Sequence, residues 1–396
     1  MTDIFKIITP LLLLLSLFYY YRRSGFVLQR LFLVWLFSFF AFGQNYLFHF
    51  REVHQIIQLT LSFLAIGYCI KNNSLTRPPI YFFIFGFFIF ISLVFNGFDS
   101  DASSACINFL SIFVFFWAFI CRKDVIANFN VVLKFWCSSA VILSLAAILE
   151  SLVTGVGRSE VTFANPNYLA YVLGTGFCLT SILKTKNIIL IRLIIFVGIL
   201  ATASRSGIVF VGLFILSEIW YSKSAQKKLF MSMILVAGVI FIVTFLQKNR
   251  DGSEASDGER LLISNIVLEI VNDRPMVGVG WGRFTNEFNS YAATIPNVVL
   301  STGDEIDFSN RERLVTHNDY FRIAAELGLP ALIFALFATV LNFKLLLKLN
   351  PQIRLWLFPV WLGVVAFSLG HNNLNNVTFW LFFWMPYLYT RLRYTV

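Results

Sequence analysis

The chain alternates long apolar runs with short polar connections. A helix that crosses a bilayer needs about 20 predominantly apolar residues, and about 13 runs come close to this requirement. These runs cover residues 4–21, 26–48, 53–70, 79–98, 105–121, 126–150, 167–183, 187–204, 206–221, 229–247, 323–349, 355–370 and 375–390. Because backbone polar groups inside a bilayer must be satisfied within the segment, the runs are expected to be helices. The pattern predicts an all-α fold, a polytopic transmembrane helix bundle of about 12–13 spans.

One polar connection, residues 248–322, is long enough to have a fold of its own. It divides the chain into three expected parts: a membrane helix bundle over 1–247, a large external loop with short helices over 248–322, and C-terminal membrane spans over 323–396. Apolar residues recur at helical spacing in 259–271, which predicts a helix that lies on the membrane surface or packs on the bundle. The glycine-rich stretch 275–282 predicts a tight turn.

Composition agrees with a membrane protein, since 58% of the residues are hydrophobic, 13% are charged and the mean hydropathy is +0.75. The formal net charge is +10, but the basic residues fall mainly in alternate connections, as is typical of loops that stay in the cytoplasm. The other connections are expected to face the periplasm, and they are residues 49–52, 99–104, 151–166, 204–206, 248–322 and 371–374. The charge therefore indicates membrane topology, and no nucleic acid partner is expected.

The cysteines lie in or at the edge of apolar runs, and they are Cys69, Cys106, Cys121, Cys137 and Cys178. They form no Cys-x-x-Cys pair and have no histidine at metal-ligand spacing. We expect them to behave as small apolar residues, and we predict neither a disulfide nor a zinc site.

His317 is the first candidate for chemistry, because it stands where the long external loop meets an apolar helix. Thr316 and Asp319 fit a capping box, which predicts that a helix begins here with His317 in its first turn. The positive end of the helix dipole disfavours imidazolium, so His317 is expected to be neutral and able to accept a proton. The alternative is a histidine that only caps or hydrogen-bonds the start of the helix.

Two further arginines belong to the external connections. Arg205 lies in a connection with almost no loop, and a charge so close to apolar spans is costly unless it is paired or functional. The alternative is an interfacial arginine that reaches lipid phosphates. Arg158 precedes the sequence Asn165-Pro166-Asn167, in which Asn165 is a good N-cap and Pro166 a good first helical residue. Capping explains Asn165 and Pro166, but it does not explain Arg158.

The long loop contains more arginines, which share it with twelve acidic residues: Arg260, Arg274, Arg283, Arg311, Arg313 and Arg322. Some must be paired, and Arg322 with Glu326 has the i,i+4 spacing of a helical ion pair. A bidentate guanidinium is also the natural clamp for a pyrophosphate. Asp99 and Asp101 offer a different chemistry, since an Asp-x-Asp pair can bind a divalent cation on a sugar phosphate.

Several of these features together resemble the bacterial O-antigen ligase/polymerase family. They are Arg205 in Ala-Ser-Arg-Ser-Gly, the Phe-x-Asn-Pro-Asn segment, the Pro-x-x-Gly-x-Gly-Trp-Gly turn, and His317-Asn318 followed by Glu326-x-Gly328. The resemblance covers about residues 155–345, whereas the first 150 residues match only as a series of hydrophobic spans.

The resemblance implies a metal-independent glycosyltransferase of the bacterial inner membrane, with its active site facing the periplasm and no cofactor. The implied partners are an undecaprenyl-pyrophosphate-linked glycan as donor, membrane lipid, and an acceptor. That acceptor is the lipid A core in a ligase, which we favour slightly, or a growing polysaccharide in a polymerase. The resemblance assigns catalysis to His317 and Arg205. The implied substrate-binding residues are Arg158, Asn165, Asn167, Arg260, Arg274, Arg283, Arg311, Arg313, Asn318 and Glu326.

Two other classes of protein are alternatives. A transporter, such as a flippase for lipid-linked oligosaccharide, predicts charged residues inside the spans and repeated halves. Here the charged and glycine-rich features gather on one face instead, and no repeat is evident. A metal-dependent lipid-linked glycosyltransferase would depend on Asp99 and Asp101.

Overall fold

The structure is a computed structural model that describes most of the chain. The described residues are 2–42, 50–72, 80–120, 129–155, 157–163, 165–221, 253–293, 298–299, 305–306 and 315–393, with the single residues 224, 226, 229, 232, 233 and 238. Arg311 and Arg313 lie outside the described residues, as does Cys121. Cys69, Cys106, Cys137 and Cys178 are free thiols.

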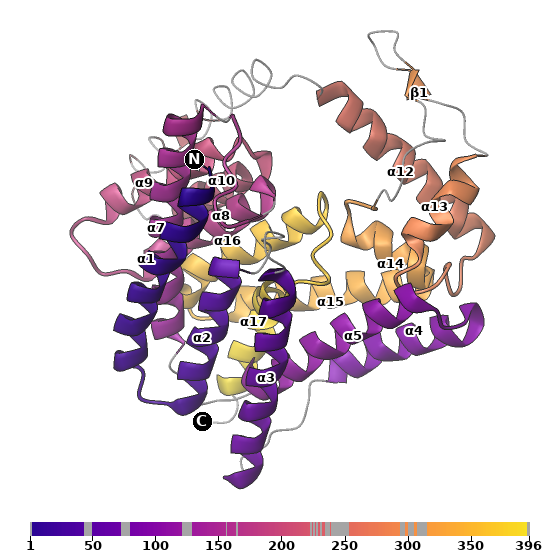
Figure 1. Cartoon of the computed structure of the whole chain (residues 1–396), viewed down its shortest axis with the longest axis horizontal. Coiled ribbons are helices and arrows are strands. Elements are labelled where there is room, and N and C mark those ends of the chain that lie inside the picture. The colour runs from indigo at the N-terminus through magenta and orange to yellow at the C-terminus, as the bar shows by residue number, and fades with distance from the viewer. Residues whose placement is uncertain are drawn as a thin grey trace.

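Helices make up nearly all of the described chain, and Figure 1 labels them. In chain order they are α1 (Thr2–Arg23), α2 (Val27–Phe42), α3 (Phe50–Lys71), α4 (Ile80–Asn96), α5 (Ser100–Phe115) with a π-helical end (Phe116–Ile120), α7 (Asn130–Thr154), α8 (Pro166–Leu179) with a 3₁₀ end (Thr180–Ile182), α9 (Ile188–Ala201), α10 (Arg205–Tyr221), α12 (Ser253–Asp273), α13 (Phe284–Ala292), α14 (Asp319–Leu327), α15 (Leu329–Lys348), α16 (Pro351–Ser368) and α17 (Val377–Arg393). The two-residue strands β1 (Val298–Val299) and β2 (Glu305–Ile306) pair antiparallel. The predicted all-α membrane fold is confirmed.

Five helical segments are long and apolar enough to cross a membrane, judged by length and composition over the described residues. They are Ile4–Arg23, Ser100–Phe119, Asn130–Thr154, Leu329–Lys348 and Pro351–Ser368, and shorter apolar helices at Val27–Phe42, Ile80–Asn96 and Ile188–Ala201 accompany them. The predicted runs coincide with helices of the structure, apart from the run 229–247, which lies mostly outside the described residues.

The predicted run 323–349 is not a single helix, and this boundary was wrong. α14 ends at Leu327 and α15 begins at Leu329, because Gly328 has φ 85° and ψ 176°. Essentially only glycine adopts this conformation, and Pro330 near the start of α15 favours a new helix. A short helix therefore precedes the span α15.

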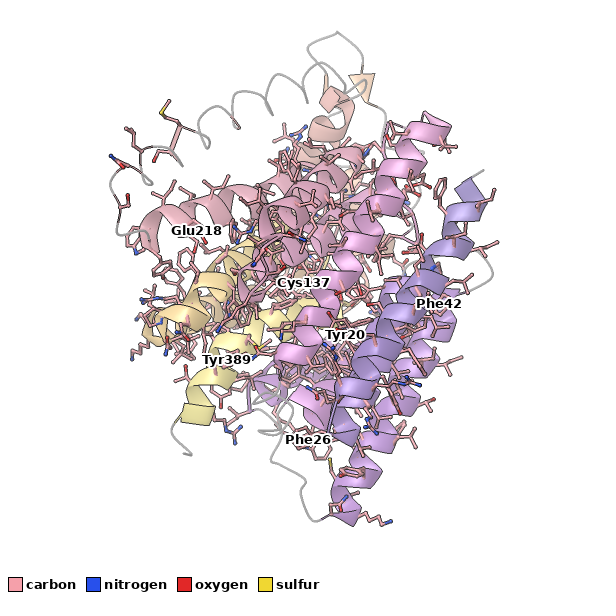
Figure 2. All side chains as sticks on the ribbon, turned by 90° about the vertical axis from the view of Figure 1, so that its left-hand side faces the viewer. Tyr20, Phe26, Phe42, Cys137, Glu218 and Tyr389 are labelled. Atoms are coloured by element: carbon pink, nitrogen blue, oxygen red, sulfur yellow. The ribbon has the colours of Figure 1, made fainter. Side chains whose placement is uncertain are left out.

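The membrane bundle packs by interlocking aromatic and small side chains. α1 lies against α7, where the Tyr20 hydroxyl is 2.8 Å from Ser138 Oγ. Figure 2 labels Tyr20 beside Cys137 at this contact. Trp136 of α7 is fully buried and donates its indole N–H to the carbonyl of Val172 on α8 at 3.1 Å. These contacts fix α7 and α8, which position one part of the site.

The long external segment forms a second, smaller core. Leu262, Ile266 and Ile270 of α12 are buried against Phe284 and Phe288 of α13, and Ala325 of α14 belongs to the same cluster. Figure 1 shows α12, α13 and α14 together on one side of the molecule. The amphipathic stretch 259–271 is helical, as predicted, and its apolar face packs on α13 and α14.

Connections predicted to face the same side of the membrane contact each other. Arg283, after the glycine-rich turn, pairs with Asp99 at 2.8 Å. Thr316 donates its hydroxyl to Asn372 Oδ1 at 2.7 Å. These contacts join connections that lie far apart in the sequence, so the polar features gather at one end of the bundle.

Candidate active site

A pocket opens where α8, α10, α12 and α16 come together at this end of the bundle. It holds about 650 Å³ of space, part of it open to solvent. Three arginines line it, Arg158, Arg205 and Arg260, together with Asn167 and His371. The rest of its wall comes from the segments 203–209 and 366–370. The structure thus brings together four residues that the sequence singled out, and it adds His371.

The charge of the pocket suits an anion. The side chains of Arg158, Arg205 and Arg260 are exposed. The first turns of α8 and α10 also line the pocket, through Asn167 and Arg205. Helix N-termini attract anions because their first N–H groups have no partner within the helix. Guanidinium groups and helix N-termini together form a site in which a diphosphate would be stabilised.

A buried carboxylate at the end of α7 fixes the segment that carries Arg158. Glu150 Oε2 accepts the backbone N–H groups of Glu160, at 3.1 Å, and of Val161, at 3.0 Å, and also the hydroxyl of Ser159. The N–H of Ser159 donates to the carbonyl of Ala201 at 3.0 Å, which ties the segment to the end of α9. The sequence analysis missed Glu150, although an acidic residue at the external end of an apolar run is a signal.

Arg205 is the first residue of α10, directly after the tight turn from α9. In this turn, Ser204 donates its hydroxyl to Asn167 Oδ1 at 2.8 Å, so the starts of α8 and α10 are joined. Gly207 allows the helices to come close, because a Cβ there would lie 2.7 Å from Ile199 Cγ2 and 3.1 Å from Ala170 Cβ. In the Ala-Ser-Arg-Ser-Gly sequence, Ser204 and Gly207 therefore hold the backbone on either side of Arg205 and place Arg205 at the pocket.

His317 lies beside the pocket but does not line it, and it precedes its helix. The N-cap of α14 is Asn318, whose Oδ1 accepts the N–H groups of Tyr320, at 2.9 Å, and Phe321, at 3.1 Å. The predicted capping box with Thr316 was wrong, because the side chain of Thr316 bonds to Asn372 instead. His317 has φ 49° and is half-buried, one residue before the N-cap.

The connection between α16 and α17 is a part of the site that the sequence analysis missed. Asp319 Oδ1 accepts the backbone N–H groups of Asn373, at 2.7 Å, and Leu374, at 3.1 Å. At its start, His371 stacks on Phe367 with ring centroids 4.2 Å apart and planes 10° apart. The run of histidine and asparagine between two apolar spans, His-Asn-Asn-Leu-Asn-Asn, was an available signal.

The two histidines have depressed pKa values. Burial lowers the pKa of His317, and the positive charge of Arg260 lowers it further. Burial also lowers the pKa of His371, to about 4, and Arg260, His317 and Arg158 act in the same direction. Burial raises the pKa of Asp319 to about 7, although the N–H groups of Leu374 and Asn373 oppose that shift. Both imidazoles are therefore neutral at pH 7.

Backbone strain surrounds the pocket. Over the described residues, the non-glycine positions with positive φ are Val161, Ala203 and His317, with φ of 53°, 48° and 49°. Each of these conformations costs about 1–3 kcal/mol and persists only where the surroundings impose it. Such positions cluster at functional sites, and here they flank the three segments that carry Arg158, Arg205 and His317.

Glu326 lies away from the pocket, in a buried structural contact. Its Oε2 accepts Arg322 Nε at 3.0 Å, which confirms the predicted i,i+4 pair, and the N–H of Gly282 at 2.9 Å. Arg322 lies over the ring of Trp281, 4.5 Å from its centroid. Glu326 therefore attaches the glycine-rich turn to α14.

Arg274 and Arg283 also lie outside the pocket. Arg283 pairs with Asp99 at 2.8 Å, and Arg274 donates to Asn96 Oδ1 at 3.3 Å. Asp99 additionally caps α5, and Asp101 accepts a hydrogen bond from the side chain of Asn286. These two carboxylates, considered as metal ligands in the sequence, thus bond to protein groups.

The remaining sequence candidates are caps. Asn165 is the N-cap of α8 and accepts the N–H of Asn167 at 2.8 Å, as predicted. Asn318 caps α14 in the same way.

The family model described as O-antigen ligase matches residues 190–336. Over this segment, which is less than half of the chain, the protein is similar to the O-antigen ligase family. The O-antigen ligase match includes Arg205, Arg260 and His317, whereas Arg158 and His371 lie outside it. The match supports a glycosyltransferase or ligase type of enzyme with lipid-linked glycans or polysaccharides as substrates. A search of curated proteins found no match.

Proposed function

We propose that this protein transfers a saccharide from an undecaprenyl-pyrophosphate carrier to a sugar hydroxyl, at the periplasmic face of a bacterial inner membrane. The observation that carries the proposal is the pocket in which Arg158, Arg205 and Arg260 meet beside a neutral His317. The O-antigen ligase family supports the general reaction class.

The arginines would bind and stabilise the leaving group. When the bond between the anomeric carbon and the diphosphate oxygen breaks, negative charge develops on the diphosphate. Arg158, Arg205 and Arg260 come from three separate segments, so they can contact different oxygen atoms of it. Rigid attachment supports this role, because Glu150 fixes the segment of Arg158 and Ser204 fixes the turn of Arg205.

His317 would act as the general base. The acceptor hydroxyl attacks the anomeric carbon, the new carbon–oxygen bond forms as the bond to the diphosphate breaks, and the hydroxyl proton passes to the imidazole. A base must be neutral to accept that proton, and burial with Arg260 nearby makes His317 neutral. A single direct displacement would invert the configuration at the anomeric carbon.

The acceptor decides between the two members of the reaction class. A ligase transfers the glycan to the lipid A core, and a polymerase transfers it to another carrier-linked glycan. We favour the ligase because the description of the matching family model is O-antigen ligase.

The experiment is a transfer assay with the purified protein in detergent. It is incubated with undecaprenyl-pyrophosphate-linked glycan, with and without lipid A core, and each reaction is run with and without EDTA. Glycan joined to the core would support the ligase, and lengthened carrier-linked glycan would support the polymerase. If product forms without EDTA and disappears with it, the metal-independent mechanism is wrong. If no product forms in any condition, the proposed reaction is wrong.

A further inference from the structure

His371 is a polar group in the pocket wall that the reaction described above does not use. It follows α16 in the chain and lines the same pocket as Arg158, Arg205 and Arg260. It lies outside the segment that matches the O-antigen ligase family. Its position therefore requires a separate explanation.

The imidazole of His371 lacks hydrogen bonds. Neither Nδ1 nor Nε2 has a hydrogen-bond partner among the described residues, and both atoms are covered. The Phe367 backbone is close enough to raise the pKa of His371 as a hydrogen-bond partner would, but the contact does not reach hydrogen-bond geometry. Buried polar groups in proteins are nearly always hydrogen-bonded, so each exception calls for an explanation such as a missing ligand.

Packing holds the ring at the edge of the pocket. The ring lies nearly parallel to Phe367, with centroids 4.2 Å apart, and its centroid is 6.5 Å from that of Tyr168 in an edge-on arrangement. The next residue, Asn372, is held by two hydrogen bonds. Its backbone carbonyl accepts the Tyr168 hydroxyl at 2.8 Å, and its side-chain Oδ1 accepts the Thr316 hydroxyl. The backbone beside His371 is thus fixed, while the imidazole is held mainly by ring contacts.

We propose that His371 is a diphosphate-binding residue: its imidazole turns from Phe367 and donates a hydrogen bond to an oxygen of a diphosphate bound by Arg158, Arg205 and Arg260. This inference rests on the proposed function, since it assigns a further contact to the same donor. A hydrogen bond to an anion is stronger than an aromatic stack, so the exchange is favourable.

Anion binding also changes the charge of His371. Burial lowers its pKa to about 4, and the cationic groups facing it, Arg260 of α12 and Arg158, add to burial. Among the described residues, Arg205 at the start of α10, the neutral His317 and the Tyr168 phenol of α8 also lie around it. A bound diphosphate favours imidazolium, so the pKa rises and the ring takes up a proton as the pH falls.

The test uses inorganic pyrophosphate as the probe and the full-length protein in detergent. The protein has four histidines, His49, His54, His317 and His371, so ¹³C-labelled histidine gives few signals, which single substitutions assign. The pKa of His371 is measured with and without pyrophosphate. We expect it to rise by about one unit or more when pyrophosphate binds, as for an opposite charge nearby.

Affinity provides a second, independent measurement. His371→Phe preserves an aromatic ring beside Phe367 and removes both nitrogens, so we expect pyrophosphate to bind about tenfold more weakly. The matched control is His54→Phe, because His54 is also a buried histidine among aromatic rings but lies on α3, and it should leave the affinity unchanged. Both variants are first checked for an unchanged elution profile in gel filtration.

The outcomes separate this inference from the proposed function. If the wild type binds no pyrophosphate, both are overturned. A second outcome is that the wild type binds pyrophosphate and Arg260→Gln binds it more weakly, which supports the diphosphate site. If in that case His371→Phe binds normally and the pKa of His371 does not change, the role of His371 is overturned. A pKa rise together with weaker binding in His371→Phe supports the inference.

Discussion

The positive charge of Arg260 acts on both His317 and His371. It lowers the pKa of His317 and of His371, in each case in addition to burial. Arg260 comes from α12, which belongs to the external segment and not to the membrane bundle. At the residue scale, the proposed base His317 therefore lies near the cation Arg260, which lowers its pKa.

The pH profile of transfer should reveal this coupling. Because the pKa of His317 is lowered from the usual histidine value near 6.5, the acidic limb of kcat/KM, where the base becomes protonated, should have its midpoint below pH 6.5. Removing a positive charge favours imidazolium, so Arg260→Gln should move the acidic limb to higher pH. The measurement is kcat/KM between pH 4.5 and 8, and Arg260→Lys, which retains the charge, is the control. An unchanged limb in Arg260→Gln would contradict the coupling.

His317→Ala tests the base directly. General bases contribute about 10²–10⁴-fold to rate, so kcat should fall by at least about a hundredfold. Membrane insertion and pyrophosphate affinity should remain, because the arginines bind the diphosphate. His54→Ala removes a buried imidazole elsewhere and should retain activity. Wild-type transfer by His317→Ala would refute the assigned role.

Single carboxylates at or near helix ends hold the segments that carry the site residues. The segment of Arg158 follows α7 and is fixed by the Glu150 carboxylate, and the glycine-rich turn is fixed on α14 by Glu326. α14 and α15 are separated by Gly328, which lets the turn approach the backbone there. At the element scale, single residues at helix ends determine where the functional side chains lie.

Glu150→Ala should loosen the segment of Arg158. The substitution leaves buried N–H groups of Glu160 and Val161 without their acceptor, which should reduce the free energy of unfolding by about 2–4 kcal/mol. KM for the lipid-linked donor should rise more than kcat falls, because Arg158 binds the diphosphate. Glu150→Gln retains one acceptor oxygen and should have a smaller effect in denaturant unfolding and in kinetics. Equal effects of the two substitutions would argue against the hydrogen bonds as the cause.

Gly328→Ala should destabilise the junction of α14 and α15. A Cβ at this position would lie 2.5 Å from the backbone carbon of Met276, and the φ of 85° is strained for alanine. We expect a loss of at least about 2 kcal/mol, seen as a lower melting temperature in detergent. Gly67→Ala is the matched control, because Gly67 lies in α3 and an added Cβ meets nothing within 4 Å. Equal melting temperatures for the two variants would contradict the assigned strain.

The whole molecule separates a polar end from an apolar bundle. The pocket, the glycine-rich turn, and the connection after α16 all lie at one end, whereas basic residues such as Lys184 and Lys186 belong to connections predicted to face the cytoplasm. A reaction on a lipid-linked donor needs this arrangement, because the carrier chain remains in the bilayer while the diphosphate enters the pocket.

Cysteine labelling tests the orientation of the molecule. In a variant without the native cysteines, Leu369→Cys and Lys186→Cys each place a thiol at an exposed position. In spheroplasts, a membrane-impermeant maleimide should label Leu369→Cys, whereas Lys186→Cys should be labelled only after the membrane is permeabilised. The reverse pattern would place the pocket on the cytoplasmic side and contradict the proposed periplasmic reaction.

Features that depend on neighbouring residues could be predicted without the fold. Apolar run length predicted the helices, Asn165-Pro166 predicted the start of α8, and the i,i+4 spacing predicted the pair of Arg322 with Glu326. Each of these depends on a few residues of local chain, where helical geometry alone fixes which groups meet. Local reasoning failed where two local choices competed, as at Asn318, which caps α14 in place of Thr316.

Which residues share the pocket depends on long-range packing, which the sequence pattern does not reveal. Arg158, Arg205 and Arg260 meet there, while Arg274 and Arg283, of the same residue type and in the same external segment as Arg260, bond to residues around α4 and α5. No local pattern distinguishes these arginines, because their positions follow from how α12 packs on α13 and α14. His371 and Glu150 were missed for the same physical reason: their surroundings come from segments distant in sequence, and long-range packing determines which segments those are.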